Sequence, residues 1–163
     1  MDPEKWKRFV QRIDVNAPLK SVYAAWSTSK GLTGWCSMEA LLQNKDGKEL
    51  APGTSVVPGD SFRFAWHTGH TEEGTYLEAN DVDHLRYTFG KDIVVNVTME
   101  PMEDGTVMVT LEQTQDRTDE ENLGILLGFK EGWAFYLTNL KSVLEGGLDL
   151  RNYTHDIEHR VNY

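Results

Sequence analysis

Residues 118–147 read TDEENLGILLGFKEGWAFYLTNLKSVLEGG. This stretch predicts one long helix, with Thr118 and Glu121 as a capping box at its start and the glycine pair 146–147 at its end. Apolar residues recur in it at alternating spacings of three and four, interrupted only by Lys130. They are Leu123, Leu126, Trp133, Leu137, Leu140 and Leu144, with Phe129, Tyr136 and Val143 beside them. So wide a stripe favours burial against a sheet rather than against a single helix.

The chain before this helix is rich in the two-residue alternation that is typical of strands. Apolar and polar residues alternate within 7–15, 60–67, 73–79, 85–89, 93–99 and 106–113. The pairs Asn80–Asp81 and Asp104–Gly105 are turn signals. Pro18 predicts a helix start, and a second short helical turn lies between Gly31 and Gly34. We therefore expect an α+β fold with two short helices after the first strand, an antiparallel sheet and one long C-terminal helix.

Length and charge limit the function classes. The 163 residues predict one domain over 1–163, with a core of about 9–151 and a polar C-terminal tail over 152–163. With 26 acidic and 16 basic residues the formal net charge is −10, which argues against nucleic acid as a partner. The longest apolar run, 123–129, is shorter than a membrane span. The single cysteine, Cys36, excludes an internal disulfide and favours a reducing compartment, so we expect a cytoplasmic protein, either monomer or homodimer.

Four segments, in order, carry a family resemblance. They are 13–26 (IDVNAPLKSVYAAW), 31–35 (GLTGW), the pair 74–78 and 84–89, and the helix segment from Gly132–Trp133 to 146. The chain resembles the START-like, or Bet v 1-like (SRPBCC), superfamily and, within it, the activator of Hsp90 ATPase homolog 1-like proteins. Cys36 departs from the phenylalanine that is common in that family. The resemblance implies a helix-grip fold, in which a curved sheet wraps around the long helix and leaves a cavity between them.

The inward face of such a sheet, together with the facing helix, would line this cavity. Tyr87 would supply a hydroxyl group, Trp66 and Trp133 would supply N–H donors, and Lys130 would place a charge at the rim. A filled core needs the same residues, so the sequence leaves both a cavity and a filled core open. The lining residues that we predict are Phe64, Trp66, Leu77, Tyr87, Phe89, Val95, Val97, Val109, Leu111, Lys130, Trp133, Leu137 and Leu140.

Few residues suggest chemistry. His67 and His70, followed by Glu72 and Glu73, contain zinc-ligand types, but a solvated hairpin tip explains them better, and we predict neither a metal nor another cofactor. His155 and His159 lie in the polar tail, where a charged surface turn explains them. Cys36 has no cation near it in sequence and is interpreted as a structural thiol. We find no nucleophile elbow and no phosphate-binding glycine loop, so we assign no catalytic residue.

Three glycines recur every four residues in the first half of the long helix. Gly124, Gly128 and Gly132 would each cost about 1 kcal/mol relative to alanine. We hypothesise that they let this half of the helix bend as a gate to the cavity, so that alanine at 124 and 128 would slow exchange of a bound probe. A subunit contact that includes Phe135 is the competing explanation.

Three functions remain open. We favour non-catalytic binding of a small hydrophobic ligand in the cavity. The alternative is a chaperone cofactor that contacts an Hsp90-type ATPase, or a stress-related protein-interaction domain, since the acidic stretch 100–121 could steer a basic partner. The third is an enzyme of the cyclase or hydrolase kind that shares this fold; we rank it last because few titratable residues occupy inward positions.

Overall fold

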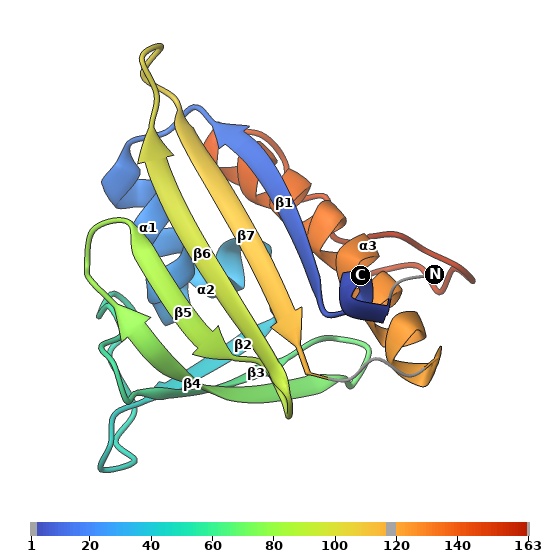
Figure 1. The fold of residues 1–163 in the computed structure, drawn as a ribbon. Coiled ribbons are helices and arrows are strands. Elements are labelled where there is room, and N and C mark those ends of the chain that lie inside the picture. Colours follow the sequence, from blue (N-terminus) through green and yellow to red (C-terminus); the bar gives the residue numbers. More distant parts are fainter. Residues whose placement is uncertain (1–2, 117–119, 163) are drawn as a thin grey trace.

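A computed structural model describes residues 3–116 and 120–162. Seven strands form one antiparallel sheet in the order β1-β7-β6-β5-β4-β3-β2, and the long helix α3 lies across its inner face (Figure 1). The elements are η1 (Pro3–Trp6), β1 (Arg8–Val15), α1 (Leu19–Ser27), α2 (Ser29–Trp35), β2 (Glu39–Gln43), β3 (Ser61–Ala65), β4 (Thr71–Ala79), β5 (His84–Thr88), β6 (Ile93–Pro101), β7 (Val107–Gln115) and α3 (Glu120–Leu144). The α+β helix-grip fold predicted from the sequence is confirmed.

The alternation of buried and more exposed side chains along the strands shows which face of the sheet is buried. In β7 every second side chain from Val107 to Gln115 is buried, and in β6 the same holds from Val95 to Met99. The α3 stripe covers this face through Leu126, Trp133, Leu137 and Leu140, which are all at most 5% exposed. The core therefore lies between the sheet and α3, as the helix stripe predicts.

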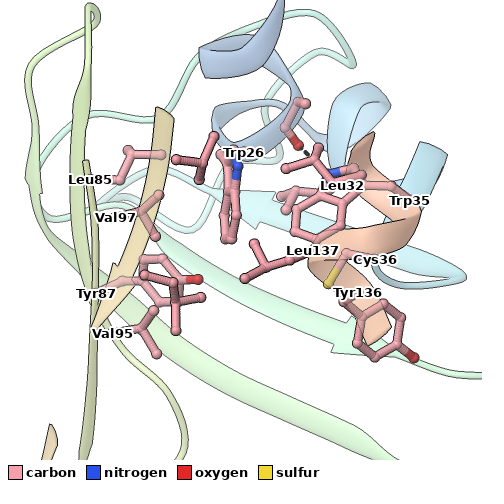
Figure 2. Close-up of a cluster of buried hydrophobic side chains, with 14 of the residues drawn as sticks. Trp26, Leu32, Trp35, Cys36, Leu85, Tyr87, Val95, Val97, Tyr136 and Leu137 are labelled. Atoms are coloured by element: carbon pink, nitrogen blue, oxygen red, sulfur yellow. Dashed lines mark hydrogen bonds between the residues drawn. The ribbon is translucent and has the colours of Figure 1, made fainter. Parts of the chain in front are cut away.

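Helices α1 and α2 close one end of this core. Trp26 and Trp35 pack against each other with ring centroids 4.5 Å apart, and Trp26 also stacks on Trp133 of α3. Figure 2 shows the rings of Trp26 and Trp35 above Leu137, with Val97 of the sheet opposite Trp26. Burial of so much aromatic surface fixes the end of α2 and the segment after it, which forms the floor of the pocket described below.

One sequence expectation about the strands is wrong, and one strand was missed. Leu77 was expected to face inward, but it is 41% exposed, while its neighbour Tyr76 is 1% exposed. A β-bulge between Tyr76 and Glu78 inserts Leu77 as an extra residue opposite β5, and this shifts the inward phase by one. The edge strand β2 was not predicted at all.

The helix cap expected at Thr118 lies outside the described residues, and the described part of α3 begins at Glu120. The end predicted from the glycine pair agrees with the structure, since α3 ends at Leu144 and Gly146 has a positive φ of 80°. Only a residue that tolerates this conformation can end the helix in this way.

The segment after α3 folds back onto the domain. Arg151, whose side chain is 4% exposed, donates to the carbonyl oxygens of Thr33 and Ser37, each at 2.9 Å. The backbone N–H of Asn152 donates to the carbonyl oxygen of Asn162, which closes the last residues into a loop. Arg151, the last residue of the expected core, is thus tied to Thr33 of α2 and to Ser37, and residues of the expected tail 152–163 are bonded to one another.

Candidate functional site

A pocket of about 430 Å³ lies beside the N-terminal half of α3. This volume falls in the range of about 300–1,000 Å³ that is typical of small-molecule sites. Its walls come from α3, from the connection between β3 and β4, from the end of β5 and from the residue that follows α2. The lining residues are Cys36, Trp66, Thr68, His70, Phe89, Ile125, Gly128, Phe129, Gly132, Trp133 and Tyr136.

Aromatic rings make most of the wall. Phe89 packs edge-on against Phe129 at 5.7 Å and lies 5.9 Å from the ring of Trp133. Across the pocket, the ring of Trp66 lies 5.3 Å from that of His70. Rings held in this way offer flat apolar surfaces that lose little side-chain entropy when a ligand binds.

The backbone of residues 35–37, of which Cys36 lines the pocket, forms its floor. Each of the three carbonyl oxygens in this segment accepts a hydrogen bond from a side chain of another part of the chain. Asn139 of α3 donates to the carbonyl oxygen of Trp35 at 2.8 Å, and the indole N–H of Trp66 donates to that of Cys36 at 2.9 Å. Arg151 donates to the next carbonyl oxygen, that of Ser37. Since a buried carbonyl without a partner is costly, these three bonds fix the backbone under the pocket. The site is therefore preorganised by three separate elements.

Two glycines of α3 make room for the pocket. Gly128 and Gly132 line it, and a Cβ atom added to either would have no atom within 4 Å. Gly124 has the same open surroundings but is not among the lining residues. Each step of four residues rotates the position by about 40° around the helix axis. The three glycines therefore pass from the surface at Gly124 to the pocket at Gly128 and Gly132. Their role as a gate stays a prediction.

The thiol and the phenol in the pocket are poor acids. Burial raises the pKa of the Cys36 thiol to about 12, although the charge of Arg151 lowers it slightly. Burial also raises the pKa of Tyr136, against the weaker opposing effects of Arg151 and of a hydrogen bond from Trp66. Figure 2 shows the sulfur of Cys36 close to Tyr136. Because a thiolate is the reactive form, Cys36 is a structural thiol at neutral pH.

The mouth of the pocket carries a contact between a histidine and a carboxylate. His70 Nε2 lies 3.3 Å from Glu72 Oε1, and the Glu72 side chain is 19% exposed. Burial raises the pKa of Glu72, and the neighbouring Glu73 adds to this, while His70 opposes it. Within the described ranges no three His, Cys, Asp or Glu side chains gather where they could hold a metal ion.

The predicted lining residues fall into three groups. Trp66, Phe89 and Trp133 line the pocket. Leu77 and Lys130 do not: Leu77 is on the outer face, and Lys130 is exposed, with its backbone carbonyl bonded to Gln11. The others are buried within the packed core: Phe64, Tyr87, Val95, Val97, Val109, Leu111, Leu137 and Leu140.

Sequence reasoning missed most of the α3 wall and the polar mouth. It did not assign Ile125, Phe129 or Tyr136 to the pocket, nor Thr68 and His70. The glycine row was the one signal that pointed to this flank of α3, since a row without side chains leaves space beside a helix.

A family model described as activator of Hsp90 ATPase homolog 1-like protein matches residues 16–145. The chain belongs to this family. The resemblance expected from the sequence is therefore confirmed over all four of its segments except the first three residues, 13–15, and residue 146. The comparison with curated proteins gave no match.

Solved structures with the same fold extend the family assignment to the architecture. A Staphylococcus saprophyticus protein is 21% identical, with a TM-score of 0.69, over 88% of this chain and 96% of that one. The Aha1 dimer from Colwellia psychrerythraea is 17% identical, with a TM-score of 0.68, over 86% and 97%. A Mesorhizobium loti protein is 19% identical, with a TM-score of 0.69, over 86% and 98%. At these identities the likeness is one of fold.

None of the helices within residues 3–116 and 120–162 is both long enough and apolar enough to cross a bilayer.

Proposed function

We propose that this protein binds a small apolar ligand in the pocket between α3 and the β3–β4 connection. The observation that carries the proposal is the pocket itself: about 430 Å³, walled by five aromatic side chains and two glycines, on a backbone floor held by three side-chain hydrogen bonds. Ligand sites in proteins combine an apolar wall with a few placed polar groups, and here Tyr136, Thr68 and His70 supply them.

The experiment is a fluorescence titration with N-phenyl-1-naphthylamine, a neutral apolar probe. Gly132→Leu places an isobutyl group in the pocket, and an extra group in a filled site costs about 1–3 kcal/mol. We expect saturable binding to the wild type and a loss of about tenfold or more in affinity in the variant.

Gly124→Leu is the matched control. It makes the same substitution in the same helix, at a position that is equally open but does not line the pocket. It should bind the probe as the wild type does. No saturable binding to the wild type, or equal losses in both variants, would reject the proposal.

A second candidate function is contact with an Hsp90-type ATPase, because the matching family model bears that description. The hairpin between β6 and β7 exposes Glu100, Glu103 and Asp104, an acidic surface that would attract a basic partner. The test is the ATPase rate of an Hsp90-type chaperone with and without the protein. A raised rate that survives Gly132→Leu would assign this activity to the surface; an unchanged rate would remove the candidate.

A further inference from the structure

The lining of the pocket carries no lysine, arginine, aspartate or glutamate among the described residues. The carboxylate of Glu72 lies beside two residues at its mouth. Glu72 lies opposite Phe64 in the β3–β4 ladder, at an alternate position to the exposed Glu73, and its side chain is 19% exposed. Any ligand charge inside the pocket would therefore face an acidic group at the entrance.

Two contacts place this carboxylate at the mouth. Oε1 lies 3.3 Å from Nε2 of His70, which lines the pocket. Oε2 lies 2.7 Å from the position that a Cβ atom would take on Gly90, and Gly90 directly follows Phe89, another lining residue. The carboxylate thus lies between two of the segments that form the pocket.

A cation near the floor does not offset this acidity. The charge of Arg151 acts on Cys36 and Tyr136, but most of its N–H groups are already used. Nη1 donates to Ser37, Nη2 to Thr33 and Asp149, and Nε to Asp149, so four of the five N–H groups have partners and the charge is paired with a carboxylate.

We propose that the pocket selects an organic cation, namely an amine or quaternary ammonium group carried on an apolar or aromatic body. This inference rests on the proposed function and names its ligand class. The faces of tryptophan, tyrosine and phenylalanine attract cations, and five such rings line the pocket. Glu72 adds an unlike charge at the entrance in a poorly solvated position. A ligand with a carboxylate would meet like charge at the entrance and, near the floor, a cation that is already paired with Asp149.

The experiment compares three probes that share one naphthalene ring. They are (1-naphthylmethyl)trimethylammonium, 1-ethylnaphthalene and 1-naphthylacetate, each measured by displacement of N-phenyl-1-naphthylamine. We expect the cation to bind about tenfold more tightly than the neutral probe and the anion to bind more weakly than both.

Glu72→Gln is the decisive variant, because it keeps the shape of the side chain and removes its charge. We expect the ratio of cation to neutral affinity to fall to less than half of its wild-type value, while Glu73→Gln, on the outer face, leaves the ratio unchanged. The ratio is the readout because a change in pocket shape alters both affinities together.

The outcomes separate the two proposals. If the neutral probe binds and the cation shows no preference, or if Glu72→Gln leaves the preference intact, the assignment of an organic cation is overturned and the apolar site stands. If no probe binds to the wild type, both proposals fall.

Discussion

Arg151 offers a sharp test of how the pocket floor is held. It lies after α3, yet its side chain is 4% exposed and reaches the carbonyl groups of Thr33 and Ser37 while pairing with Asp149 at 2.8 Å. We predict that Arg151→Ala destabilises the fold although it alters neither the sheet nor the helices.

The loss of unfolding free energy follows from the polar groups that lose their partner when the Arg151 side chain is removed. Ser37 is fully buried, so its carbonyl group would have no water to replace the lost donor, at a cost of about 1–3 kcal/mol. Thr33 is only half-buried and Asp149 is 35% exposed in its side chain, so each of these losses costs about 1 kcal/mol or less. The sum is about 3 kcal/mol, which for a chain of this size lowers the melting temperature by roughly 6–12 °C.

Thermal and urea unfolding, followed by circular dichroism, measure this loss. Arg151→Lys is the control, because it keeps the charge but cannot reach three partners with a planar fork; we expect about half of the effect. A loss below about 0.5 kcal/mol for Arg151→Ala would refute the reasoning, since it would mean that the buried carbonyl needs no partner.

The pH dependence gives a second check on the same side chain. Burial raises the pKa of Asp149, but hydrogen bonds from Arg151 and Asn139 outweigh this, and its pKa lies below the ordinary value of 3.8. A carboxyl group with a lowered folded-state pKa contributes stability above its unfolded pKa and loses it as the pH falls through the folded value. The difference between wild type and Arg151→Ala should therefore shrink below about pH 4.

Three further predictions concern single positions. Gly74→Ala should prevent stable folding, because its Cβ atom would collide with a backbone carbonyl oxygen of β5, while Gly34→Ala, with nothing within 4 Å, should leave the melting temperature unchanged or slightly higher. Cys36, with a pKa of about 12, should resist a disulfide reagent such as DTNB at pH 8 in the folded protein and react once urea unfolds it; rapid reaction of the folded protein would contradict its burial. Glu72→Gln should be more stable than the wild type at neutral pH, with no gain below about pH 4. A carboxyl group whose folded-state pKa is raised loses stability as the pH rises, so a gain that does not depend on pH would contradict the assignment.

The sequence predicted the fold wherever one face of an element is buried along its whole length. The α3 stripe and the alternation of β7 are examples, because burial imposes their period directly. β2 escaped prediction because Leu41 and Leu42 are adjacent and only Leu42 is fully buried, so this edge strand has no alternation. Leu77 was placed on the wrong face because a bulge changes the phase without any change in composition.

The pocket was harder to predict than the fold. Val97 in the core and Phe89 in the pocket follow the same apolar pattern, and only the packing of α3 decides which of them borders empty space. The β3–β4 connection that carries His70 reads in sequence as a solvated hairpin tip, and nothing in its composition places it against α3. Gly128 and Gly132 were recognised as unusual, but their winding from the surface into the pocket depends on the contacts of the folded helix.

The most direct test of the central claim is a crystal structure of the protein grown with N-phenyl-1-naphthylamine. The account predicts density for the probe between Trp66, Phe129 and Gly132, with the backbone at Cys36 unmoved. A probe bound elsewhere, or a pocket closed by α3 and the β3–β4 connection in the same crystal, would contradict it.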